Sequence, residues 1–278
     1  MSTVRSVAST GLALAVGLGL LAVSPTASAV DPLDTFSFRI GGYVNTFDTQ
    51  LRADGQTTTG TEFDLDRDLN LDKDSTIGLV GVTWRPFEKH EFAFSYRQDD
   101  KEATTHLQRD INFDGTVYPR SATVRSQVAV DVYEASYVWW AASHDTWAIG
   151  PRLGLTWYSV DMRIDMERDA AGNPVNSSVS SDVSLDLPEP TIGGSWRWTP
   201  SKQWRLSADA GFLTTDIGDV DADVFFARAG VEWYPWERTG FWLDYTISDI
   251  DANIDKDRYN GSFVLRDSGI RLGVAYRF

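Results

Sequence analysis

Residues 268–278, SGIRLGVAYRF, end the chain with a regular alternation of side chains. From Ile270 onward every even-numbered residue is apolar and ends on the aromatic Phe278, whereas the odd-numbered residues are Gly, Arg or Ala. Successive side chains of a β-strand point to opposite faces. The segment is therefore predicted to be a strand with one face in lipid and the other toward a polar interior.

The same period-two alternation recurs throughout the chain and predicts ten strands. They lie at residues 36–52, 75–86, 89–105, 122–140, 145–166, 182–199, 202–215, 222–235, 240–250 and 261–278. Short and long connections alternate between them, as an up-and-down antiparallel barrel requires. The predicted fold class is all-β, an up-and-down antiparallel transmembrane β-barrel of ten strands. Eight or twelve strands are the alternatives, because Pro188 and Pro190 interrupt the sixth strand.

Residues 1–29 are predicted to be a cleaved secretory signal peptide. Arg5 is basic, residues 11–23 are apolar, and Ala27-Ser28-Ala29 has the A-x-A form of a cleavage site. The apolar stretch is shorter than the roughly 20 residues that a membrane-spanning helix needs. Residues 30–278 are then expected to form a single barrel domain.

Composition excludes several classes of function. The chain has 40 acidic and 25 basic residues, a net charge of -15, and this acidic surplus argues against a nucleic-acid partner. The absence of Cys excludes disulfides, thiolate catalysis and Cys-bound metals. The acidic surplus lies in the longer connections, which are the predicted outer loops, and in the strand ends beside them.

Tryptophan is abundant, and its positions cluster. Ten of the 11 Trp residues lie beside the four short connections: Trp84, Trp139, Trp140, Trp147, Trp196, Trp198, Trp204, Trp233, Trp236 and Trp242. An indole is apolar but carries an N–H that needs a polar partner, so membrane–water interfaces favour it. The positions predict a girdle of indoles at one interface.

The polar face of each predicted strand gives a set of lumen-lining candidates. They are Arg39, Arg97, Arg152, Arg197, Arg205, Asp209, Arg228, Glu232, Asp244 and Arg271, with Asp131 or Glu134 added depending on a bulge near Val132. An Arg facing lipid at mid-membrane would cost about 2–4 kcal/mol, which favours the inward assignment. Two interpretations stay open: an Arg-lined passage for anions or small polar solutes, and a salt-bridged plug.

An acidic segment at residues 62–75 carries Asp64, Asp66, Asp68, Asp72 and Asp74 at period two, with Asn70 completing the series. On an extended strand they would share one face, which suggests a weak divalent-cation site; a solvated acidic loop is the alternative. An EF-hand does not fit, because Leu69 stands where Gly is needed and Ser75 where Glu is needed.

Histidines give little indication of catalysis. His90 and His144 lie in or beside short turns, and only His106 falls near the predicted outer rim, with Asp99, Asp100 and Asp110 in its vicinity. No enzymatic activity and no cofactor are expected. A rim hydrolase or lipid-modifying enzyme that uses His106 is the minor alternative.

Three stretches carry a resemblance to a known class: 36–43 (FSFRIGGY), 187–194 (LPEPTIGG) and the aromatic C-terminus. Over nearly all of residues 30–278 the chain resembles small porin-like outer-membrane β-barrels of Gram-negative bacteria. The resemblance implies contact with outer-membrane lipid and lipopolysaccharide, and recognition of the last strand, ending at Phe278, by the barrel assembly machinery. An even strand number places both mature termini in the periplasm.

The function predicted from these features is limited passage of small solutes or ions through an Arg-rich lumen. The alternative is a structural or surface-binding barrel with a salt-bridged lumen and cation-binding acidic outer loops.

Overall fold

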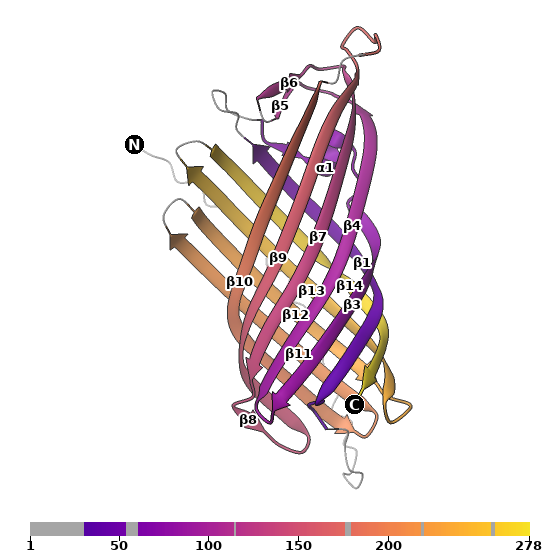
Figure 1. The fold of residues 1–278 in the computed structure, drawn as a ribbon, viewed down its shortest axis with the longest axis vertical. Coiled ribbons are helices and arrows are strands. Elements are labelled where there is room, and N and C mark those ends of the chain that lie inside the picture. The colour runs from indigo at the N-terminus through magenta and orange to yellow at the C-terminus, as the bar shows by residue number, and fades with distance from the viewer. Residues whose placement is uncertain (1–30, 54–60, 114, 176–178, 218–219, 257–258) are drawn as a thin grey trace, which may run out of the picture.

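The computed structural model describes residues 31–53, 61–113, 115–175, 179–217, 220–256 and 259–278, so the predicted signal peptide at 1–29 lies outside the described residues. Ten long antiparallel strands close into a barrel, in the order β10-β11-β12-β13-β14-β1-β3-β4-β7-β9 and back to β10 (Figure 1). Their bounds are Phe36–Ala53 (β1), Asp74–Phe87 (β3), His90–His106 (β4), Thr123–Trp139 (β7), Trp147–Arg168 (β9), Ser180–Ser201 (β10), Trp204–Ile217 (β11), Val220–Trp233 (β12), Thr239–Lys256 (β13) and Tyr259–Arg277 (β14). The predicted fold class and the count of ten are confirmed.

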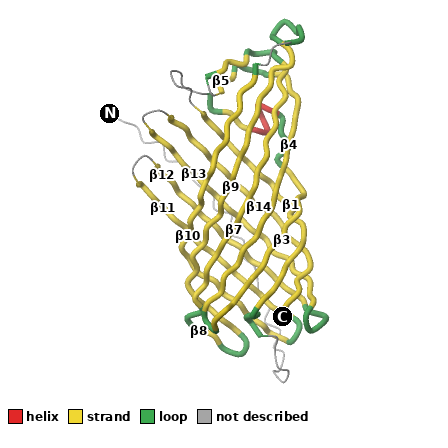
Figure 2. The backbone as a smooth tube through the Cα atoms, viewed as in Figure 1, coloured by secondary structure: helices red, strands yellow, loops and turns green. Residues whose placement is uncertain are grey.

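The two ends of the barrel differ in their connections (Figure 2). One end, the turn end, carries the short connections and β8 (Ala142–Ser143). The other, the loop end, carries β2 (Phe63–Asp64), the short helix α1 (Leu65–Leu69), and the hairpin of β5 (Ile111–Phe113) and β6 (Thr116–Tyr118). No helix among the described residues is long and apolar enough to cross a membrane.

The polarity of the inward-facing and outward-facing side chains reverses along the long strands. In the half of β9 near the turn end, Leu153 and Trp157 are exposed outward and Arg152 is buried inside. Farther toward the loop end the same strand turns Arg163 outward and buries Ile164. A strand has a fixed alternation, so this reversal means that the outer wall changes from an apolar to a polar surrounding at about Trp157.

The exposed apolar residues form a band around the outer wall. It includes Phe38, Ile40, Val80, Phe94, Tyr133, Ile149, Leu153, Leu155, Ile192, Phe212, Phe225, Leu243, Tyr245, Ile270 and Leu272. A continuous exposed apolar surface of this extent marks contact with lipid or another apolar partner.

The interior of the loop end is an apolar core. Its buried members are Leu69, Leu71, Leu107, Ile111, Phe113, Tyr118, Val124, Val128, Val130, Val132, Tyr158, Met162, Ile164, Leu187, Val224, Ile250, Ala252 and Leu265. They come from the strands, α1, the β5–β6 hairpin and the connections that hold Leu71 and Leu107. The loop end is therefore packed like a barrel in water, with apolar side chains inside and charged ones outside.

This reversal resolves the ambiguity on β7. Glu134 is buried inside and Asp131 points to the outer wall, where it accepts a hydrogen bond from the Tyr96 hydroxyl at 2.6 Å. No bulge lies between them, because β7 keeps one register with β9 from Val124 to Val138. Asp131 simply stands beyond the point where the polarity of the outer wall changes.

Two tryptophans do not belong to the predicted girdle. Trp84, Trp139, Trp204, Trp233 and Trp236 are exposed near the turn end, but Trp140 and Trp242 are buried inside the barrel. Trp140 donates its indole N–H to Glu91 at 3.2 Å. Trp242 lies against Gly41, where a Cβ would stand 2.7 Å from the indole. The large indole of Trp242 therefore fits inside the barrel only because Gly41, its neighbour, has no side chain.

Candidate functional site: the charged lumen

All ten predicted lumen residues point into the barrel, in the half nearest the turn end. Seven of them, Arg97, Arg152, Arg205, Asp209, Glu232, Asp244 and Arg271, are buried. The side chains of Arg39, Arg197 and Arg228 are 28%, 15% and 15% exposed, and all three line a central cavity. The strand alternation explains this placement, because on each strand these residues alternate with the outward-facing apolar residues of the band.

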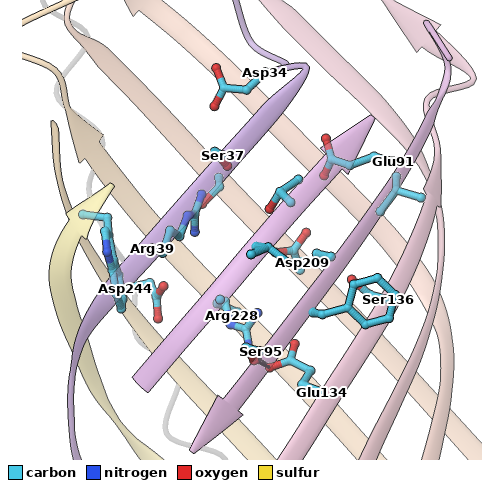
Figure 3. Close-up of a pocket in the computed structure, with 18 of the residues that line it drawn as sticks. Asp34, Ser37, Arg39, Glu91, Ser95, Glu134, Ser136, Asp209, Arg228 and Asp244 are labelled. Carbon is cyan, nitrogen blue, oxygen red and sulfur yellow. Dashed lines mark hydrogen bonds and ion pairs between the residues drawn. The ribbon is translucent and has the colours of Figure 1, made fainter. Parts of the chain in front are cut away.

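Glu134 is the hub of the largest ion-pair group. Its carboxylate lies 2.8 Å from Arg228, 3.4 Å from Arg152 and 3.8 Å from Arg271. Arg271 also donates two hydrogen bonds to Asp244, at 2.6 and 3.0 Å. Five strands, β7 and β9 on one side of the barrel and β12, β13 and β14 on the other, are thus joined across its centre (Figure 3).

A second group lies nearer the turn end and centres on Glu232. Arg39 and Arg205 both form ion pairs with it, Arg205 at 3.2 Å. The Tyr234 hydroxyl donates a further hydrogen bond to the same carboxylate at 2.6 Å. Several donors on one carboxylate offset the cost of removing its charge from water.

Residues 31–35 close the turn end from inside. Asp34 accepts two hydrogen bonds from Arg205, both at 2.7 Å, and lies 3.7 Å from Arg277. Leu33 packs with Val138 and Trp140. The segment before the first strand is therefore held as an N-terminal plug, which we define as residues 31–35.

Two more pairs complete the lumen. Arg197 donates to Asp209 at 2.9 Å, and Arg97 donates to Asp267 at 2.8 Å. Asp267 also accepts hydrogen bonds from Tyr43 and Asn45. Every one of the seven predicted arginines therefore has a carboxylate partner, and the lumen carries little uncompensated charge.

Sequence reasoning missed three of these carboxylates. Asp267 lies an even number of residues from Arg271 on β14, and Glu91 lies an even number from Arg97 on β4. Each therefore faces the lumen with that arginine, and the strand alternation could have indicated both. Asp34 precedes the first strand and has no pattern around it that could have indicated its place.

A cavity of about 90 Å³ remains between the charged groups (Figure 3). The Nε atoms of Arg39, Arg205 and Arg228 are buried and make no hydrogen bond to any described residue. A polar cavity of this size has room for ordered water, which can satisfy such donors. The cavity is small for a passage that conducts solutes.

The acidic segment does not form the predicted extended strand. Residues 65–69 are helical, and Asp64 caps this helix by accepting from the backbone N–H groups of Asp66 and Arg67. Asp74 instead accepts from Thr46 at 2.8 Å. Because the helical turn interrupts the segment, Asp64, Asp66, Asp68, Asp72 and Asp74 do not share one extended strand, and this part of the prediction is wrong. No cluster of three potential metal ligands occurs among the described residues.

Asp68 has a structural role outside the membrane-facing band. Its carboxylate lies 2.7 Å from Arg109, across the loop end. Burial opposes its ionisation, but hydrogen bonds from Arg109, the Asp64 backbone and Arg67 outweigh that effect and hold the pKa of Asp68 below its usual value. The aspartate ties α1 to the connection that follows β4.

His106, the residue on which the minor alternative depends, ends β4. Its ring hydrogen-bonds to the Thr123 hydroxyl at 2.9 Å. Within the described part of the chain, no hydrogen bond or ion pair joins it to Asp99, Asp100 or Asp110: Asp99 accepts from Ser75, and Asp110 accepts from the backbone of Arg120.

The sequence matches no protein family and no curated protein. Among solved structures, the fold is similar to the outer membrane protease OmpT from Escherichia coli, with a TM-score of 0.58, 9% identity, and coverage of 87% of this chain and 96% of OmpT. The toluene transporter TodX of Pseudomonas putida gives a TM-score of 0.37 at 8% identity, covering 88% and 90% of the two chains. Ail of Yersinia pestis gives 0.26 at 9%, covering 86% and 99%. The likeness to OmpT shows that the chain has the closed ten-stranded fold of outer-membrane β-barrels, and it shows the fold alone.

Proposed function

We propose that the protein is an outer-membrane β-barrel of a Gram-negative bacterium with a closed lumen, which acts at the cell surface through its loop end. The observation that carries this proposal is the filling of the barrel. Ion pairs occupy the half near the turn end, and apolar side chains occupy the loop end. This is the structural or surface-binding alternative rather than the porin-like one.

The outer wall supports the membrane placement. The apolar band gives a lipid-facing surface, and exposed indoles border it at the turn end. Asp34 and Phe278 both lie at the turn end, which we assign to the periplasm. Phe278 is exposed and contacts Phe36, as befits a C-terminal strand that the assembly machinery reads. The loop end then faces lipopolysaccharide, whose cations its acidic surface can share.

Cysteine labelling on intact cells tests the proposal cleanly, because the chain has no Cys. Asp161→Cys places a thiol on the outer wall of the loop end, and Leu153→Cys places one in the apolar band. A membrane-impermeant maleimide is expected to label the first and not the second. Equal labelling of both, or labelling of neither, would contradict the placement.

A porin-like passage is the second candidate, and the Arg-lined cavity behind the N-terminal plug favours it. If the plug gates a passage, Asp34→Ala should weaken its attachment and raise bilayer conductance above the wild-type value. If the ion-pair groups close the lumen by themselves, the variant conducts no more than the wild type.

A further inference from the structure

The barrel wall is incomplete between β10 and β11. These strands pair only from Ile192 and Phe212 to Ser201 and Trp204, near the turn end. Beyond that point β10 continues to Ser180 along β9 alone, while β11 follows β12 away from it (Figure 1). No backbone hydrogen bond from a described residue reaches the β11-facing edge of β10 between Ser180 and Thr191.

The direction of the backbone groups along this edge follows from two hydrogen bonds. Thr199 donates its N–H to Thr146, and Val179 accepts from Met166; both partners lie on the β9 side. Backbone groups alternate along a strand, so odd-numbered residues of β10 serve β9 and even-numbered residues face the open edge. One register with β9 runs from Ser180 to Trp198, so this parity holds throughout.

The two prolines fit this edge. Pro188 and Pro190 are even-numbered, so the N–H groups that they lack would have pointed into the gap. Pro188 pairs with Trp157, at the border of the apolar band, where an unpaired N–H would be costly. Farther out, Ser180, Asp182, Ser184 and Asp186 keep N–H groups that face the gap. We call residues 180–186 the free edge.

A similar gap between β3 and β4 is closed by side chains. Pairing of these strands stops at Leu79 and Arg97. Beyond it, Lys101 donates to the Asp72 carbonyl at 2.6 Å and Ser75 donates to Asp99 at 2.6 Å. The free edge of β10 has no such cover from the described residues.

We propose that the free edge binds an extended, basic peptide segment of a partner protein, which adds to β10 as a further strand. An edge strand presents unpaired N–H and C=O groups that an extended chain can pair with. This inference rests on the proposed function, since the edge must stand outside the membrane.

Charge and polarity define the partner. On the outer wall, Asp182 and Asp186 are exposed; Asp182 pairs with Arg163 at 3.1 Å, and Asp186 accepts from the Trp157 indole at 3.2 Å, so Asp186 is the carboxylate without a cationic partner among the described residues. On the inner side, Val183 and Leu185 are half-buried against the apolar core. On the β9 side of β10, away from the free edge, a groove of about 450 Å³ runs over β4, β7, β9 and β10. Its charged lining residues are Asp100, Lys101, Glu102, Asp161, Arg163 and Asp182. A strand that alternates Lys or Arg with apolar residues complements both faces.

A proline substitution tests the backbone contact directly. Ser184→Pro removes one N–H from the free edge and leaves the ladder to β9 intact, and Ser184→Ala is the matched control because it keeps the N–H. The probe is a synthetic octapeptide of alternating lysine and valine, titrated onto the full-length refolded protein in detergent micelles. Saturable binding by wild type and Ser184→Ala is expected, with at least a tenfold weaker affinity for Ser184→Pro.

A second measurement does not depend on the fold of any variant. The same peptide with N-methyl groups on alternate residues should lose binding to the wild type, and a glutamate–valine peptide should not bind. Equal affinity of Ser184→Pro and Ser184→Ala, equal affinity of the methylated peptide, or no saturable binding would each overturn the docking site. Surface labelling at position 161 reports on the proposed function separately, so the two failures are distinguishable.

Discussion

At the scale of single residues, Glu134 shows how the lumen tolerates buried charge. Its carboxylate is almost fully enclosed and lies within 4 Å of three guanidinium groups. A buried ion pair is seldom a large net gain in stability, but removing one partner leaves the others buried without compensation. Glu134 therefore fixes the positions of Arg152, Arg228 and Arg271.

Glu134→Gln should lower the free energy of unfolding by about 3–5 kcal/mol, because three arginines lose their shared anion. Glu102→Gln is the control, since the Glu102–Arg125 pair is exposed and such pairs contribute roughly 0–1 kcal/mol. Urea unfolding in micelles, followed by tryptophan fluorescence, measures both. Equal effects of the two substitutions would show that the Glu134 group is not a structural hub.

The lumen residues could be predicted from parity, but their partners could not. Alternation tells which face a side chain takes, so Arg39 and Glu232 were both found. It does not tell which strands lie opposite across the lumen, so the pairing of these two residues had to come from the closed fold. Asp34 was missed because it lies outside any strand.

At the scale of elements, the conformation of the segment around α1 follows its helix cap and its buried leucines, and not its period-two pattern of aspartates. The aspartates at every second position predicted an extended strand. Asp64 instead accepts hydrogen bonds from the first N–H groups of a short helix. Leu69 and Leu71 are buried in the apolar core. A single helical turn is too short to show a 3.6-residue period in the sequence.

The attachment of α1 should depend on pH through Asp68. Its pKa is lower in the folded loop than in the unfolded chain, so the stabilisation is fully present above the unfolded value of about 4 and is lost as the pH falls through the folded value. The protection factors of residues 65–71 against hydrogen exchange should therefore fall at low pH. Asp68→Asn should abolish this pH dependence; an unchanged dependence in that variant would contradict the assignment.

The tryptophans near the turn end should divide into two groups in the membrane. Trp84 is 51% exposed on the outer wall, whereas Trp140 is fully buried inside. In proteoliposomes made with brominated lipid, Trp84→Phe should reduce the quenchable fluorescence and Trp140→Phe should leave it unchanged. A loss of quenching with Trp140→Phe would place that indole in the girdle after all.

At the scale of the whole molecule, the outer wall of the barrel is apolar near the turn end and polar at the loop end. The strand number and most strand bounds could be predicted, because the alternation continues along each strand. The apolar filling of the loop end beyond Trp157 could not, because the charge pattern indicates an acidic outer face but does not tell which side chains fill the interior there. At the loop end, acidic residues such as Asp161 and Asp182 lie on the outer wall, and apolar residues fill the interior.

Planar-bilayer conductance of the refolded wild-type protein tests the closed lumen most directly. The paired arginines near the turn end and the apolar core at the loop end predict no conductance steps above those of the empty bilayer. A stable ohmic conductance that rises with salt concentration would contradict the closed lumen and favour a porin-like passage.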